Sequence, residues 1–254
     1  MPLTVSNNSA VAAASYHLGK NQQALQSSIK KLASGKKFAG ANTDPGTLSV
    51  SMKLNAAVSR LTGARNNVQG GISFLEVQDG MLESAGRIVN RMAELKGMAT
   101  QDPMKSAQDV ASYDNEFRDL QVQLYQISQQ TFNGASLFAV ATTPAGAPDV
   151  VFRGTVVQDS TISIFTSSNG STGTKISIHR GALLSALTVN TKTGTSSAYA
   201  TTGNATAAVI NGAGETVAFA SADSTTTLNL SQVTMGVFEQ ALSNIAFLRA
   251  QNGG

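Results

Sequence analysis

Few side chains in this sequence have the chemistry of a catalytic or metal-binding site. The 254 residues include two histidines and no cysteine. His17 and His179 stand apart from any metal-ligand spacing, and the missing thiols exclude thiolate sites for zinc or iron–sulfur clusters. We therefore expect no metal, no cofactor and no catalytic histidine.

Four carboxylates on one predicted helix are the other candidates for chemistry. Glu76, Asp79, Glu83 and Glu94 recur at spacings close to whole helical turns, so a general-acid pair could be drawn among them. Charges at such spacing more often form a solvated face or a subunit contact, and we favour that interpretation. The Gly-rich segment 203–215 lacks the lysine and the long helix of a phosphate-binding loop, so it predicts a hairpin or loop. The sequence predicts that the chain is not an enzyme.

The composition narrows the possible partners. Charged residues make up only 13% of the chain, and the net charge of +3 comes from basic residues without a cluster of five or more. We expect no nucleic-acid partner. The longest apolar run near the N-terminus, Val11 to Ala14, is too short for a signal-peptide core or a membrane span. We expect no membrane insertion, and export without a cleaved signal peptide if the protein leaves the cell.

The spacing of apolar residues predicts long helices, and these must position any functional surface. Over residues 3–33 an apolar stripe of the coiled-coil kind predicts a helix that needs a partner. We call this stripe the assembly seam; it comprises Val11, Leu18, Leu25, Ile29 and Leu32.

A second, longer helix is predicted to start at Asp44-Pro45, a cap followed by proline at the first helical position, and to run to about Thr100. Its heptad positions are Leu54, Val58, Leu61, Val68, Ile72, Leu75, Leu82 and Val89. Its glycines are candidates for close contacts or bends. Asp102-Pro103 predicts the end of this helix and the cap of the next, which we expect to run back antiparallel. The apolar positions of that helix are Tyr113, Phe117, Leu120, Leu124 and Ile127, and Asn133-Gly134 predicts a turn after it.

The composition and the apolar spacing change after residue 138. Residues 139–227 are rich in Ser, Thr and Gly, with short alternating runs that predict strands and hairpins. Helical spacing returns at Leu230, Val233, Val237, Leu242, Ile245 and Leu248. The predicted fold is mainly α: a long-helix coiled-coil bundle with an inserted β-rich region, α+β overall. We expect four parts: 1–43 as terminal helix and linker, 44–138 as the first part of the bundle, 139–227 as the β-rich insertion, and 228–254 as a returning helix.

Three stretches resemble bacterial flagellin, the flagellar filament subunit. They are residues 24–54, ALQSSIKKLASGKKFAGANTDPGTLSVSMKL; residues 66–99, NNVQGGISFLEVQDGMLESAGRIVNRMAELKGMA; and residues 124–138, LYQISQQTFNGASLF. The likeness is strong over about residues 3–138 and moderate over 228–252. It implies a secreted structural protein that self-assembles for motility, in the extracellular filament. Its implied partners are other flagellin subunits, the flagellar export apparatus, and cap and junction proteins.

The resemblance also implies two further expectations. A vertebrate innate immune receptor senses the family's outer-tube surface, and the matching positions here are Arg91, Leu95 and Glu116. Family members continue well past the stretch matched by residues 243–254, so the sequence is expected to be a shortened form of a longer chain, poorly able to polymerise. A hook–filament junction protein and an adhesin that binds through 139–227 remain alternatives.

Overall fold

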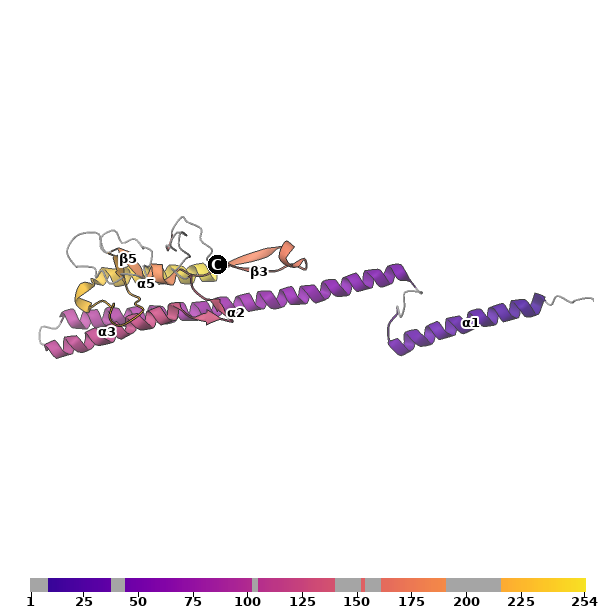
Figure 1. The fold of residues 1–254 in the computed structure, drawn as a ribbon, viewed down its shortest axis with the longest axis horizontal. Helices are drawn as coiled ribbons and strands as arrows, with labels where there is room; N and C mark the ends of the chain where they lie inside the picture. The colour runs from indigo at the N-terminus through magenta and orange to yellow at the C-terminus, as the bar shows by residue number, and fades with distance from the viewer. Residues whose placement is uncertain (1–8, 38–43, 102–104, 140–151, 154–160, 191–215) are drawn as a thin grey trace, which may run out of the picture. The chain divides into compact units, whose positions relative to one another are not determined.

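The computed structural model describes residues 9–37, 44–101, 105–139, 152–153, 161–190 and 216–254. The chain divides into two units, residues 1–63 and residues 64–254. Each is described by itself. Helix α2 (Pro45–Gln101) starts in the first unit and continues in the second (Figure 1).

The first unit contains helix α1 (Ser9–Ser34) and the start of α2. After α1, Gly35 adopts a φ of 62°, a left-handed conformation that glycine tolerates at a helix end. The predicted start of α2 is confirmed. The Asp44 carboxylate accepts the Thr47 N–H at 3.0 Å, and Pro45 is the first helical residue. The hydrogen bonds that the Thr47 hydroxyl and N–H donate to the Asp44 carboxylate lower the pKa of Asp44.

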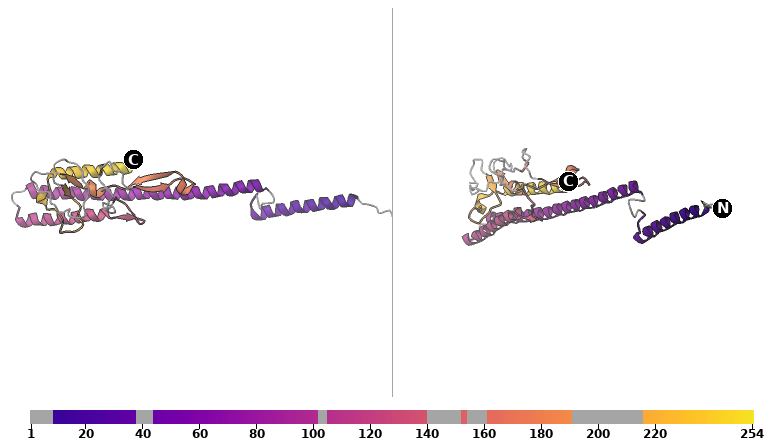
Figure 2. Two further views of the ribbon diagram at one scale, coloured as in Figure 1. Left: turned by 45° about the horizontal axis from the view of Figure 1, so that its top comes forward. Right: turned by 45° about the vertical axis from the view of Figure 1, so that its right-hand side comes forward.

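In the second unit, helix α3 (Ala107–Ser128) runs antiparallel beside the C-terminal half of α2, as predicted (Figures 1 and 2). The expected cap at Asp102-Pro103 lies outside the described residues. The observed cap of α3 is a capping box, in which Ser106 and Asp109 each accept a hydrogen bond from the other's backbone N–H. The side chain of Ser106, three residues after the proline, thus caps the start of this helix.

Short antiparallel strand pairs follow α3. Strands β1 (Thr131–Phe132) and β2 (Ala135–Ser136) form a hairpin whose turn residues Asn133 and Gly134 both have positive φ, 48° and 80°, as the Asn-Gly signal predicts. Strand β3 (Thr161–Phe165) pairs with β4 (Lys175–His179), with the 3-10 turn η1 (Gly170–Thr172) between them. Strand β5 (Thr188–Asn190) follows the short helix α4 (Leu183–Ala186) and pairs with β6 (Thr216–Ala218).

The returning helix starts later than its apolar spacing suggests. Helix α5 spans Met235–Gly253, whereas Leu230 lies in the 3-10 turn η2 (Leu230–Gln232) and Val233 follows that turn. Both side chains are nevertheless buried. The spacing identified core positions correctly, but a helical period alone does not show where the helix begins.

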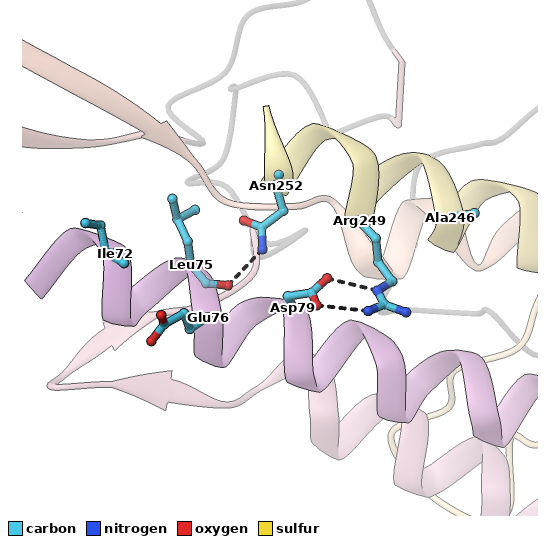
Figure 3. Close-up of a pocket in the computed structure, with 8 residues that line it drawn as sticks. Ile72, Leu75, Glu76, Asp79, Ala246, Arg249 and Asn252 are labelled. Carbon is cyan, nitrogen blue, oxygen red and sulfur yellow. Dashed lines mark hydrogen bonds and ion pairs between the residues drawn. The ribbon is translucent and has the colours of Figure 1, made fainter. Parts of the chain in front are cut away.

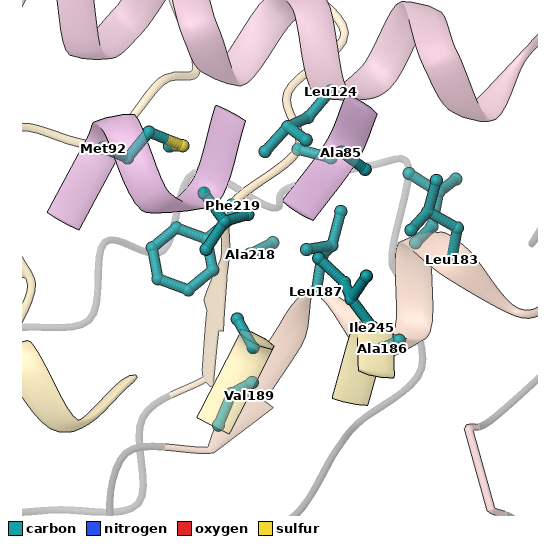
Figure 4. Close-up of a cluster of buried hydrophobic side chains, with 14 of the residues drawn as sticks. Ala85, Met92, Leu124, Leu183, Ala186, Leu187, Val189, Ala218, Phe219 and Ile245 are labelled. Carbon is teal, nitrogen blue, oxygen red and sulfur yellow. The ribbon is translucent and has the colours of Figure 1, made fainter. Parts of the chain in front are cut away.

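One hydrophobic core holds the second unit together (Figure 4). Helices α2, α3 and α5 supply Leu82, Leu124 and Ile245, while segment 183–189 and the residues after β6 supply Leu187 and Phe219. The described part of the predicted insertion is therefore only partly a surface feature, because it also fills the bundle core. The four predicted domain boundaries remain predictions.

The predicted seam of α2 is buried over only part of its length. Leu82 and Val89 are fully buried, and Leu75 packs against the core. The earlier seam positions are at least a third exposed: Leu54, Val58, Leu61, Val68 and Ile72. Coverage begins where α5 and the β3–β4 hairpin meet the helix.

Candidate subunit-contact surfaces

The assembly seam of α1 lies open. All of its side chains are between 56% and 86% exposed, and α1 contributes no buried residue. Exposed aliphatic side chains in register on one helix face are costly to leave in water and are stabilised when a second helix covers them. The structure thus shows an apolar stripe without cover among the described residues.

A groove runs between α2 and α5 in the second unit (Figure 3). It has a volume of about 730 Å³ and is lined by Ile72, Leu75, Glu76, Asp79, Ala246, Arg249, Asn252 and Gly253. The Asn252 amide donates to the Leu75 carbonyl oxygen at 2.8 Å. The groove combines apolar walls with charged groups at its centre.

A two-pronged ion pair ties the walls of this groove together. Arg249 Nε donates to Asp79 Oδ1 and Arg249 Nη2 to Asp79 Oδ2, both at 2.9 Å. The hydrogen bonding from Arg249 lowers the pKa of Asp79, and the same interaction raises the pKa of Arg249. A second contact joins Arg249 to Glu83 at 3.6 Å. The pair anchors α5 on α2.

Three of the four carboxylates considered as general acids form ion pairs with arginines, so their role is structural. Asp79 and Glu83 bind Arg249, and Glu94 binds Arg91 at 3.1 Å. Glu76 lines the groove beside Asp79. Sequence reasoning missed Arg249, although it is the sole basic residue in the C-terminal 20 residues and an acidic partner could have been sought for it.

The three positions matched to a receptor contact fall in different environments. Arg91 Nε donates to Glu116 Oε1 at 2.7 Å, and both side chains are about two-fifths exposed. The hydrogen bonds that Arg91 donates to Glu116 and Glu94 raise the pKa of Arg91. Leu95 is fully buried in the core. The structure brings Arg91 and Glu116 together at the surface and places Leu95 beneath it.

Buried amide side chains join segments that are far apart in the sequence, and sequence reasoning missed them. Gln121, fully buried on α3, donates from Nε2 to the Leu228 carbonyl oxygen at 2.8 Å and accepts the Leu228 N–H at 2.9 Å. Asn244 on α5 donates to the Ala186 carbonyl oxygen at 2.8 Å. Gln121 lies one turn after Phe117 and one turn before Leu124, beside the apolar seam, where a polar residue could have drawn attention.

Within the described ranges, no group of three or more His, Asp or Glu side chains is arranged to hold a metal ion. None of the helices that could be searched there is long and apolar enough to cross a membrane. The features that stand out are helix surfaces that remain uncovered. Fold and surfaces together define a helical bundle with uncovered helix faces.

The chain belongs to the flagellin family. Residues 5–143, more than half of the chain, match the family described as the bacterial flagellin N-terminal helical region. This family is structural and non-enzymatic. The resemblance seen in residues 24–54, 66–99 and 124–138 is thereby confirmed.

Individual relatives agree with this assignment. Flagellin of Bacillus subtilis (strain 168) is 32% identical over 161 residues, 59% of this chain and 52% of the relative. Flagellin of Escherichia coli (strain K12) is 29% identical over 140 residues, 55% of this chain and 28% of the relative. The flagellar filament 30.7 kDa core protein of Treponema maltophilum is 29% identical over 147 residues, 55% and 49% of the two chains. The matched region spans roughly a quarter to half of these relatives.

Proposed function

We propose that the chain is a structural subunit of the bacterial flagellar filament, outside the cell, and that it self-associates through its helices. Family membership supports the role. The observation that carries the mechanism is the open assembly seam on α1, because a stripe of exposed aliphatic side chains is stabilised by a neighbouring helix. The flagellar export apparatus, cap and junction proteins are further proposed partners.

The test compares seam and off-seam charges in a bacterium that expresses the epitope-tagged chain. Leu18→Glu with Leu25→Glu places two charges in the seam, whereas Ala13→Glu with Gln23→Glu adds the same charge elsewhere on α1. We expect the seam variant to be lost from sheared extracellular filaments and the control to remain. Equal incorporation of both variants would show that the seam is not an assembly surface.

The same fractionation addresses the alternatives. A filament subunit is abundant in the sheared fraction, whereas a junction protein is present in few copies. Binding of residues 139–227 to a glycan array would favour the adhesin.

A receptor contact through Arg91, Leu95 and Glu116 is a separate proposal. The exposed Arg91–Glu116 pair supports it, since arginine anchors are common in interaction hot spots. Because Leu95 is buried, its expected part is to support the helix beneath the pair. A receptor-reporter assay that stays silent at high doses of the intact chain would remove the proposal; a response lost in Arg91→Ala would support it.

A further inference from the structure

The outer edge of strand β3 has no neighbouring strand among the described residues. β3 pairs with β4 along its other edge, and the two form a sheet of two strands. The Thr166 N–H donates to the Thr174 carbonyl oxygen at 3.1 Å, so this is a hydrogen-bonded pair of residues. Because hydrogen-bonded and non-hydrogen-bonded pairs alternate, Thr161, Ser163 and Phe165 direct their backbone N–H and carbonyl groups away from β4. These backbone groups are available to a further strand.

A groove of about 410 Å³ runs along this edge of β3. Its lining includes all of residues 162–165, whose side chains alternate between the two faces of the hairpin, so the groove follows the edge of the strand and not one face. Helix α2 contributes Gly70 and Gly71 to the floor, and a Cβ at Gly70 would meet no atom within 4 Å. The floor beside the strand therefore has room for an approaching chain.

Neither β3 nor the described lining of the groove contains a charged residue. The lining consists of Asn, Gly, Ala, Ser, Ile and Phe, and β3 itself reads Thr-Ile-Ser-Ile-Phe. Proteins commonly protect an open strand edge with charged side chains, lysine above all. β4 has this protection, because Lys175 is exposed on it. β3 is thus the unprotected edge of the hairpin.

We propose that the open edge of β3 pairs with the same edge of a second copy of the chain, antiparallel and centred on Ser163. The apolar pattern of β3 is symmetric about this residue. Ile162 then lies opposite Ile164 of the second copy, and Ser163 lies opposite its own counterpart. In this register the outward N–H and carbonyl groups of the two strands meet, and a sheet of four strands forms in the order β4-β3-β3-β4.

The charges of the hairpin favour pairing through β3 over pairing through β4. Lys175 and His179 are equally distant from Ser177 along β4. An antiparallel pair of β4 strands centred on Ser177 would therefore place each lysine beside a histidine of the second copy. Like charges directly opposite each other destabilise a strand pair, so protonation of the histidine opposes this arrangement. Two β3 strands meet no such repulsion.

The proposed dimer differs from the filament contacts proposed above. A contact that uses the same patch on both copies closes after two copies and does not extend into a filament. It also does not involve the assembly seam of α1. One strand from each copy makes a small interface, so we expect the dimer to be weak and reversible.

A single introduced cysteine reports the contact, because the chain has no cysteine of its own. Ser163→Cys places a thiol at the centre of the pairing, where the Cα atoms of hydrogen-bonded partners lie about 5.5 Å apart, within disulfide range. Ser177→Cys is the control, since Ser177 is exposed and lies opposite Ser163 on β4. Under mild oxidation with copper phenanthroline, we expect Ser163→Cys to form a linked dimer about tenfold or more faster on non-reducing gels. Equal rates for the two variants would overturn the proposal.

Sedimentation velocity measures the reversible dimer without association through α1. It starts from the seam variant, Leu18→Glu with Leu25→Glu, which we expect to form a dimer as its concentration rises. Adding Ser163→Lys brings two ammonium groups together at the centre of the pairing and should raise the dissociation constant at least several-fold, whereas adding Ser177→Lys should leave it unchanged. Circular dichroism checks that the fold is kept. A seam variant that stays monomeric at its highest soluble concentration, or a dimer that tolerates Ser163→Lys, would contradict the pairing.

The same samples distinguish another occupant from a second copy. A different protein linked to Ser163→Cys in place of the dimer would identify a foreign strand on the β3 edge and overturn the proposal. Both measurements use the soluble chain and are independent of the filament fractionation. A failure here therefore leaves the proposed function standing, and incorporation of the seam variant into filaments would leave the dimer standing.

Discussion

Arg249, near the end of α5, holds Asp79 of α2 in a two-pronged ion pair with both nitrogen–oxygen distances at 2.9 Å (Figure 3). The two residues are 170 positions apart in the sequence. Together with the Asn252 amide on the Leu75 carbonyl, this pair fixes which part of α2 is covered by α5. The position of α5 determines, in turn, where the seam of α2 stops being exposed.

Removing the charge of Asp79 should lower stability modestly. Both side chains of the pair are 40% exposed, so solvent screening limits its contribution to about 0.5–1 kcal/mol. We expect Asp79→Asn to lower the free energy of unfolding by that amount in urea titrations, and by less at high salt. Glu76→Gln, in the same groove but outside the ion pair, is the control. A loss that is the same at all salt concentrations would argue against an electrostatic origin.

The same pair predicts a dependence on pH. Arg249 lowers the pKa of Asp79 below its ordinary value of 3.8, so the folded state binds the proton more weakly than the unfolded state. The stabilisation is fully present above that ordinary value and is lost as pH falls through the folded pKa. The stability difference between the unmodified chain and Asp79→Asn should therefore shrink toward zero in acid. Urea titrations at stepwise lower pH measure it, and a difference that persisted in acid would be inconsistent with this linkage.

Adjacent glycines of α2 should respond differently to alanine. A Cβ at Gly70 meets no atom within 4 Å, whereas one at Gly71 would overlap Ile164 Cδ1 and lie 3.2 Å from Ile178 Cδ1. Gly70→Ala should stabilise the helix by up to about 1 kcal/mol. Gly71→Ala should gain less or lose stability, because Ile164 must move away from the helix. Thermal unfolding of both variants gives the comparison, and equal stabilisation would mean that the β3–β4 hairpin does not rest on Gly71.

Replacing Gln121 should lower the stability of the fold far more than replacing the nearby exposed Gln123. Gln121→Met leaves the backbone N–H and carbonyl of Leu228 without their partners in a buried site, and each lost partner costs about 1–3 kcal/mol. We expect a total loss of about 2–4 kcal/mol in urea unfolding. Gln123→Met, two positions along on an exposed side of α3, should change stability by less than about 0.5 kcal/mol. Similar losses for the two would refute the buried amide bridge.

Leucine-to-alanine substitutions along the α2 seam should show which part of the seam is covered by other segments. Leu82 is fully buried, and Leu82→Ala should cost about 2–5 kcal/mol through lost contacts and a cavity. Leu54 is 60% exposed at an equivalent heptad position, and Leu54→Ala should stay within about 0.5 kcal/mol in the isolated chain. Chemical denaturation of the two variants is the measurement. A large loss at Leu54 would mean that its face is covered in solution.

The sequence by itself determined the local features of this protein. Asp44-Pro45 caps α2 and Asn133-Gly134 turns the β1–β2 hairpin because these residues impose their geometry on their immediate neighbours. The heptad spacing also identified the faces of α2 and α3 that are apolar. The residues that resemble flagellin were sufficient to identify the family.

Only the tertiary structure decided which apolar positions are covered. Leu54 and Leu82 follow one heptad pattern, yet one is exposed and the other buried, because burial depends on segments that arrive from far along the chain. The same holds for Leu95, which lies beneath the surface, and for Arg249, whose acidic partner is on another helix. A periodic pattern fixes which side of a helix seeks a partner, but long-range packing decides where along the helix that partner lies.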